Sequence, residues 1–450
     1  MSAELRATLE SVRERVQPSQ DERDRLEQAT EAVMDRARAA VEALPVTADV
    51  IRVGSTARDT WLRGERDIDI FVRFPNSLAH EELRKYGLRV GQTVLPDGRL
   101  EYAEHPYVSG EFEGYMIDLV PCFAVESGND IRSAVDRTPF HASYVKERLD
   151  APLANDVRVL KRFCDAIGIY GSDLRTQGFS GYLTELLILE YGDFETVVEE
   201  AAEWRSPVKF DPEDHGAVDF DDPLVMIDPT DPCRNVAAVV TATNVARFQH
   251  HARELIADPD VARFDVPPLP QITAETLREH LTRRGSTPIA IRFPVPGMVE
   301  DQLFPQLRRT RDGIVAMLGE HGFLVTRAAV FHEAEAVIFL ELAIAKLPNI
   351  ERHAGPPVHV KQHSRAFLNQ WDDPSVYGPF ISGDRYIVER EREFTSASAL
   401  LRSDEILSAS LGAELVEDIS NHRHILVGDQ IIDLLPEFSS ELAQFYDPRP

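Results

Sequence analysis

Three aspartates in this 450-residue chain have the residue type and spacing that metal chemistry needs. Asp67 and Asp69 are two positions apart in a β-branched segment, so on a strand both side chains point to one face. Asp118 lies in a second apolar segment, where an unpaired charge is costly. Three carboxylates on neighbouring strands repel one another unless cations lie between them, and hard oxygen ligands favour Mg²⁺. The pattern therefore predicts a magnesium site.

A Gly-Ser turn, Gly54 and Ser55, follows an apolar run shortly before the first two aspartates. Glycine allows backbone N–H groups to come close to phosphate oxygens. Nucleotidyl transfer requires such a turn beside a two-metal site, because two ions clamp the attacking hydroxyl and the leaving pyrophosphate. Arg58 is either a ligand of phosphate or base, or one half of a surface salt bridge. Each signal alone is common, so the prediction depends on their conjunction.

With these motifs the chain resembles the nucleotidyltransferase superfamily of DNA polymerase β. Within it, the chain is similar to the class I, archaeal-type CCA-adding enzymes, which are tRNA nucleotidyltransferases. The triad is shared by many enzymes, whereas later motifs point to this family. One departure is Asp67, where many relatives have Glu, and the shorter carboxylate can still bind a metal. The later motifs are R-T-P-F-H (137–141), L-K-R-F (160–163), Q-G-F-S-G-Y-L-T-E-L-L-I (177–188), D-P-T-D-P-C-R-N-V-A-A (228–238), Y-G-P-F (377–380) and G-D-R-Y (383–386).

The resemblance implies a role for each candidate residue. The three aspartates would bind Mg²⁺, and Asp118 would also help to activate the RNA 3′-hydroxyl. Arg234 is implied to bond the incoming base, whereas Asp228 and Asp231 are expected to shape a turn and cap a helix beginning at Asn235. The expected nucleotide-binding residues are Gly54, Ser55, Arg58, Thr138, His141, Lys161, Tyr170 and Arg234. Without the resemblance, His141 would be interpreted as an ordinary histidine at a helix end.

The implied reaction is the template-independent addition of C, C and A to the 3′ end of tRNA from CTP and ATP. One alternative is another enzyme of the superfamily, such as a poly(A) polymerase or an oligoadenylate synthetase-like protein. CTP use distinguishes the two. A second alternative is a catalytically inactive RNA-binding or nucleotide-sensing protein, and the presence of all three carboxylates argues against it.

The formal charge of −28 comes from 76 Asp and Glu against 48 Lys and Arg, of which only six are Lys. Composition alone favours an acidic protein that does not bind nucleic acid, because RNA binders attract phosphate through Lys and Arg. The motifs overrule that interpretation. An acidic, Lys-poor surface is expected of a halophilic protein in molar salt, where the Debye length is ~3 Å and repulsion of tRNA nearly vanishes. Bidentate Arg–phosphate contacts would then hold the RNA.

The three cysteines are far apart, which argues against a zinc knuckle or a disulfide scaffold and fits a reducing cytoplasm. No apolar run is long enough to span a membrane. A cytoplasmic enzyme without a membrane partner is therefore expected. The sequence leaves the oligomeric state open, with a homodimer as one option.

The elements that position these residues are expected to form an α+β multidomain protein. Residues 1–142 would be a polymerase β-like catalytic head, 143–258 a helical central domain completing the nucleotide pocket, and 259–450 a tRNA-binding region with a ferredoxin-like part. A Pro-rich stretch near 258–270 is interpreted as a boundary. In the C-terminal region the RNA-binding candidates are Arg308, Arg309, Arg311 and Lys361, and solvated helix charge is an equally weighted alternative for the arginines.

Local signals predict most of the individual elements. Ser19 and Glu22 form a capping box that starts a helix, and Pro45 ends that helix. Four strands and five helices are expected in the first 258 residues, and a β-α-β-β order, a loop, a strand and a helix follow. The strands are 49–53, 67–74, 99–105, 115–123, 288–293, 323–332, 336–344 and 385–391, the further helices are 79–88, 155–169, 180–191, 235–255, 301–321 and 396–411, and the loop is 355–365.

Overall fold

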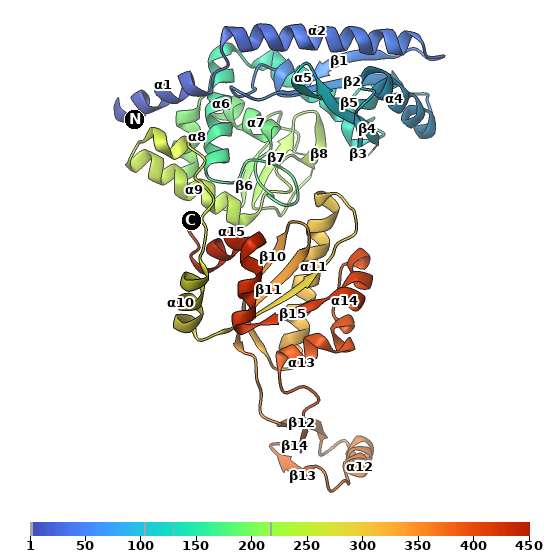
Figure 1. The fold of residues 1–450 in the computed structure, drawn as a ribbon, viewed down its shortest axis with the longest axis vertical. Helices are drawn as coiled ribbons and strands as arrows, with labels where there is room; N and C mark the ends of the chain where they lie inside the picture. Colours follow the sequence, from blue (N-terminus) through green and yellow to red (C-terminus); the bar gives the residue numbers. More distant parts are fainter. Residues whose placement is uncertain (1–2, 103–104, 129, 217) are drawn as a thin grey trace. The chain divides into compact units, whose positions relative to one another are not determined.

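The computed structural model describes residues 3–102, 105–128, 130–216 and 218–450 (Figure 1). The chain forms two compact units, one ending at Pro267 and including Pro450, the other covering 268–449. The boundary between the units lies inside the Pro-rich stretch. Among the described residues, no helix is both long and apolar enough to cross a bilayer.

A five-stranded mixed sheet forms the head of the first unit, in the order β1-β2-β5-β4-β3. Only the β2–β5 pair is parallel. Helices α2 and α4 cover the face that presents Ile68, Ile70 and Ile117, and together they form one hydrophobic core. The elements are α2 (Gln20–Glu42), β1 (Asp49–Val53), α3 (Gly54–Ala57), β2 (Asp67–Pro75), α4 (His80–Val94), β3 (Arg99–Tyr102), β4 (Pro106–Phe112) and β5 (Tyr115–Ala124).

The start of α2 follows its sequence signal. The Ser19 side chain accepts a bond from the Glu22 N–H, while the Glu22 carboxylate accepts from the Ser19 N–H at 2.8 Å. This satisfies two backbone donors that the first turn of a helix leaves without partners. The amphipathic helix then buries Leu26, Val33 and Val41 against the sheet, as predicted.

Helices dominate the rest of the first unit. Aromatic side chains of α6, α9 and the segment before α7 meet in its core, including Phe163, Phe179 and Phe248. The N-terminal helix α1 buries Leu5 and Leu9 in this same core and not in the core of the head. The elements are α1 (Ala3–Val16), η1 (Ala134–Arg137), α5 (Thr138–Arg148), α6 (Ala151–Ala166), α7 (Gly181–Tyr191), α8 (Phe194–Ala202), β6 (Val208–Phe210), β7 (Leu224–Asp228), β8 (Asp231–Asn235), α9 (Ala242–Ala257) and η2 (Val261–Phe264).

The second unit contains a four-stranded antiparallel sheet in the order β10-β11-β9-β15. Because β11 lies between β9 and β10 and is antiparallel to both, β9-α11-β10 is a split β-α-β unit, and the predicted ferredoxin-like part is confirmed. A three-stranded sheet, β12-β14-β13, is inserted between β11 and β15. The elements are α10 (Ala274–Arg284), β9 (Thr287–Phe293), α11 (Glu300–Glu320), β10 (Leu324–His332), β11 (Ala336–Ile344), β12 (Ile350–Pro357), α12 (Lys361–Gln370), β13 (Tyr377–Ser382), β14 (Arg385–Glu391), α13 (Ala397–Arg402), η3 (Asp404–Ser408), η4 (Ala413–Leu415), α14 (Val416–His422), β15 (His424–Val427), η5 (Gly428–Leu434) and α15 (Leu435–Tyr446).

The expected helix at 235–255 is wrong at its start. Residues 231–235 pair with β7 as a strand, and the helix begins at Ala242 with Thr241 as its N-cap. The Asn235 side chain explains the difference, because its oxygen accepts from the backbone of Met226 and of Ala237 and turns the chain there. Asp228 and Asp231 therefore cap no helix at Asn235.

Other predicted boundaries also differ. One expected helix is interrupted, an expected loop is partly regular structure, and another helix is longer than expected. At 396–411, Ser403 ends α13 and caps the separate turn η3. The expected loop at 355–365 is split between the end of β12 and the start of α12, and the helix expected at 79–88 continues to Val94. The strand expected at 99–105 is β3 as far as Tyr102, and residues 103–104 lie outside the described residues.

Candidate active site

The parallel pairing of β2 and β5 brings the aspartates together. Asp69 and Asp118 are direct partners in the register of this pair, and Asp67 lies two residues earlier on β2. All three are on the sheet face opposite α2 and α4, since the alternating Ile68, Ile70 and Ile117 fill the core on the other face. The arrangement predicted from the sequence is therefore present in the structure.

Gly54 lies against the Asp69 carboxylate. Its φ is +73°, a backbone conformation that glycine adopts without strain. A Cβ built at this position would overlap the Asp69 carboxylate oxygen, so no other residue fits unless the carboxylate moves. The turn that begins α3 thus touches the carboxylate pair directly, and Ser55 follows it in the same short helix.

Burial and mutual repulsion change the titration of the carboxylates on this face. Burial, together with the negative charge of Asp118, raises the pKa of Asp69 to about 6. Burial also raises the pKa of Asp118, against a hydrogen bond from Ser109 on β4. Within the described ranges, no group of three or more His, Cys, Asp or Glu side chains is arranged so that it could hold a metal ion by itself. The neighbouring Asp69 and Asp118 offer carboxylate oxygens, the donors that divalent cations bind together with nucleotide phosphates and water.

Arg58 is part of a buried polar cluster that joins the head to α6 and α7. Its Nε lies 2.9 Å from the carboxylate of Glu185, which is completely buried. Glu185 also accepts a 2.5 Å bond from the Thr60 hydroxyl, and Lys161 donates to the Thr60 carbonyl at 2.8 Å. Arg58 is thus neither a free ligand nor a surface salt bridge. Among the described residues, its two Nη groups have no hydrogen-bond partner.

Lys161 and Tyr170 lie beside the same glycine. Lys161 is fully buried, and burial lowers the pKa of its amine against the attraction of Glu185. A Cβ built on Gly181 would come to 3.1 Å from the Tyr170 hydroxyl and 3.7 Å from the Lys161 amine. The two side chains therefore lie close together beside the first residue of α7.

Thr138, His141 and Arg234 line a cavity of about 630 Å³ between α5, α7 and the β7–β8 hairpin. Helix α5 packs its Ala142 onto Val53 and Phe71, on the same sheet face as the aspartates. The cavity is large enough for a nucleotide. Tyr182 and Arg137 also line it, and neither was among the predicted residues.

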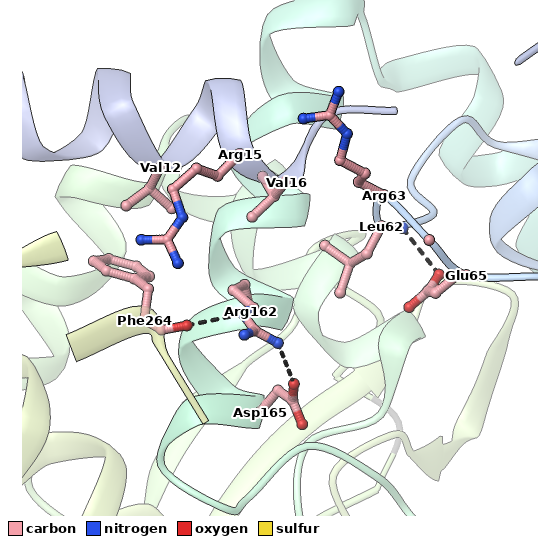
Figure 2. A pocket seen from close by; sticks show the side chains of 10 residues that line it. Val12, Arg15, Val16, Leu62, Arg63, Glu65, Arg162, Asp165 and Phe264 are labelled. Atoms are coloured by element: carbon pink, nitrogen blue, oxygen red, sulfur yellow. Dashed lines mark hydrogen bonds and ion pairs between the residues drawn. The ribbon is translucent and has the colours of Figure 1, made fainter. Parts of the chain in front are cut away.

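A second cavity, of about 430 Å³, lies between α1, α6 and the segment that precedes β2 (Figure 2). Arg162 donates to the Phe264 carbonyl at 2.8 Å and to Asp165 at 2.9 Å, while Glu65 accepts from the Leu62 N–H. None of the predicted nucleotide-binding residues lines this cavity. The predicted residues Thr138, His141 and Arg234 line the first cavity instead.

The predicted RNA-binding residues are all in the second unit and belong to two helices. Arg308, Arg309 and Arg311 lie on α11, where the Arg309 guanidinium donates to Ser410 and Arg311 pairs with Asp312. Lys361 is the exposed first residue of α12. Arg284, on α10, donates two hydrogen bonds to the buried carboxylate of Glu341 and is therefore not part of a free basic patch.

Comparison with known proteins gives a consistent answer. A nucleotidyltransferase domain model matches residues 34–141, a model of the second domain of tRNA nucleotidyltransferases matches 155–265, and a model of the CCA-adding enzyme C-terminal domain matches 284–428. The CCA-adding enzyme of Haloarcula marismortui is 51% identical over 100% of both chains, and that of Halobacterium salinarum is 53% identical over 98% of this chain and 99% of its own. The chain belongs to the CCA-adding enzyme family. It is therefore a tRNA nucleotidyltransferase, and its polymerase β-like head, helical middle part and C-terminal region agree with the predicted fold class.

A more distant relative extends the comparison beyond the halophiles. The CCA-adding enzyme of Methanosarcina barkeri is 38% identical over 92% of each chain. Nucleotidyltransferases generally use divalent metal ions, which agrees with the carboxylates on β2 and β5. Among CCA-adding enzymes, the high-identity relatives from salt-loving archaea also fit the acidic composition of this chain.

The raised pKa of Asp69 leads to a pH prediction for this CCA-adding enzyme. A divalent cation binds the ionised carboxylate, so protonation competes with the cation as the pH falls through about 6. We expect the apparent affinity for Mg²⁺ to be constant above that pH and to fall below it by up to about tenfold per pH unit. Mg²⁺ titrations of the activity across this range will measure the effect. An affinity that stays flat well below pH 6 would contradict it.

Proposed function

We propose that this enzyme adds C, C and A, in that order, to the 3′ end of tRNA, using CTP and ATP and releasing pyrophosphate. The observation that carries the proposal is the register of β2 and β5, which places Asp69 opposite Asp118 and against Gly54. The nucleotide-sized cavity lined by Thr138 and His141 adjoins the same face. We infer Mg²⁺ as the cation, because the available donors are carboxylate oxygens, and the cytoplasm as the site of action.

In the proposed reaction the 3′-oxygen of the RNA attacks the α-phosphorus of the bound nucleotide. A new P–O bond forms, the bond to the bridging oxygen breaks, and pyrophosphate leaves with that oxygen. Asp118 accepts the hydroxyl proton. Asp67, Asp69 and Asp118 would hold the metal ions, which would neutralise charge on the phosphates. The Nη groups of Arg58 and the backbone of Gly54 and Ser55 hold the β- and γ-phosphates.

Base selection is proposed to depend on Arg234. Cytosine N3 and adenine N1 are hydrogen-bond acceptors, whereas uracil N3 and guanine N1 carry a hydrogen. A guanidinium is a donor only. A guanidinium aimed at that ring nitrogen therefore favours C and A over U and G. Arg234 lines the cavity and is about one-third exposed, so its fork is accessible to a base.

The proposal predicts which nucleotides are added. A tRNA transcript without its last three nucleotides should gain two residues from CTP alone and a third only when ATP is also present. UTP and GTP should be used poorly. The assay supplies each labelled nucleotide separately, in molar KCl with Mg²⁺, and resolves the products to single-nucleotide length. A growing A ladder, or no use of CTP, would move the enzyme to another branch of the superfamily.

A further inference from the structure

Asp228, at the end of β7, is a completely buried carboxylate with an unusual number of donors. Its Oδ2 accepts from Nε2 of His141 and from Nη1 of Arg234, each at 2.8 Å. Its Oδ1 accepts from the N–H and hydroxyl of Thr230 at 2.9 and 2.8 Å, and more weakly from the Tyr182 hydroxyl at 3.4 Å. Burial by itself would raise the pKa of Asp228, but the bonds from His141, Thr230 and Arg234 outweigh it and hold the pKa well below its usual range.

Three of these donors line the cavity that is proposed to bind the nucleotide. His141, Tyr182 and Arg234 all line it, and they come from three different segments of the chain. The rings of His141 and Tyr182 stack with centroids 4.0 Å apart and planes 18° apart. One carboxylate therefore fixes three side chains that a bound nucleotide meets. No other residue described by the structure bonds to more than one of these three side chains.

Asp228 bonds only one of the three nitrogens of the Arg234 guanidinium. Among the described residues, the guanidinium bonds only the Asp228 oxygen, through Nη1, and its Nε and Nη2 groups have no hydrogen-bond partner. Because the guanidinium is planar, the hydrogen bond at Nη1 restricts the directions in which its other N–H groups point. Without the carboxylate, the side chain would regain rotamers and would reach the carbonyl oxygens of uracil or guanine as easily as the ring nitrogens of C and A.

We propose that Asp228 is the positioning residue for base selection, because it aims Arg234 and orients the His141–Tyr182 stack at the incoming base. This inference rests on the proposed function, in which Arg234 bonds the base. The same carboxylate fixes the ring of His141: a carboxylate only accepts, so Nε2 carries the hydrogen. Burial lowers the pKa of His141, which leaves the ring neutral and Nδ1 as an acceptor.

The test is Asp228→Asn, measured as the ratio of UTP to CTP incorporation into tRNA that lacks CCA. We expect this ratio to rise by about 10- to 100-fold, because the pocket no longer penalises the wrong base. The substitution should mainly lower kcat/KM for CTP. Asp219→Asn is the matched control, since that carboxylate is exposed and bonds Lys209 on the adjoining β6, and the ratio should stay at the wild-type value.

A double variant tests whether Asp228 acts through Arg234. Arg234→Ala should raise the UTP to CTP ratio as much as Asp228→Asn, and the two changes together should add little more. A folded Asp228→Asn enzyme with the wild-type ratio would overturn the proposal, as would fully additive effects. If Asp228→Asn does not fold in molar KCl, Asp228→Glu keeps the charge, moves Arg234, and should raise the ratio by a smaller amount.

The proposed function has its own outcome in the same assays. If the wild-type enzyme adds no C and A, the proposed reaction itself fails. If it adds them but Arg234→Ala leaves the ratio unchanged, the reaction stands and the base-selection inference is overturned.

Discussion

Asp69→Asn is expected to reduce catalysis at least about 1000-fold, because the ionised carboxylate supplies several kcal/mol of charge stabilisation through the bound cation. The same substitution should make the metal-free protein more stable at neutral pH. The pKa of Asp69 is raised in the folded state, so its ionisation costs the folded state free energy above about pH 6, and Asn removes that cost. The gain should be on the order of 3 kcal/mol.

A substitution that lowers the activity but raises the stability of the metal-free protein identifies a cation site. Nucleotide addition in the presence of saturating Mg²⁺ gives the first quantity, and denaturant unfolding without Mg²⁺ gives the second. Asp49→Asn is the control, because Asp49 is an exposed aspartate on β1 of the same sheet, where it pairs with Arg73. It should change neither. A stable Asp69→Asn enzyme that retains wild-type turnover would show that the site has been wrongly assigned.

The second large effect is expected at Glu185. Glu185→Gln removes the buried charge that faces Arg58 and Lys161, and leaves two cations without a counter-ion in the protein interior. Breaking one partner of a buried pair costs about 3–5 kcal/mol. The free energy of unfolding should fall by that amount, with an unchanged dependence on denaturant concentration. The KM for nucleotides should also rise, because Arg58 loses the bond that directs its Nη groups.

Glu190→Gln is the matched control, since Glu190 is an exposed glutamate on the same helix, α7. Its stability should stay within about 0.5 kcal/mol of the wild type. The comparison is made by guanidinium unfolding in buffers of equal ionic strength. Equal stabilities of the two variants would mean that the cluster around Thr60 tolerates loss of its carboxylate and does not join the head to α7 as described.

Local patterns were sufficient to predict that the aspartates of β2 share one face of the sheet. Asp67 and Asp69 lie in a segment that alternates with Ile68 and Ile70, and this period of two determines both the strand and the direction of its carboxylates. The capping box at Ser19 likewise depends only on residues three apart. These features depend on residues that are close together in the chain, so they can be predicted from a single sequence.

The residues that hold the site together were not predictable in the same way. Asp228 was expected to shape a turn, yet it bonds His141 from a distant segment. Glu185 was passed over, although a glutamate inside the apolar run 183–188 is itself a signal of a buried charge with a partner. The helix expected from Asn235 was wrong because a side-chain amide and a strand pairing overrode helical spacing. These are tertiary effects, and local propensity does not contain them.

The direct pairing of Asp69 with Asp118 also makes catalysis a reporter of folding. The two strands are far apart in the chain and must meet in parallel, which is a slow, non-local event. A slip of one residue would turn one carboxylate to the other face of the sheet. During renaturation, therefore, the return of enzymatic turnover should lag behind the return of helical signal, and would count only those molecules in which this single strand alignment has formed correctly.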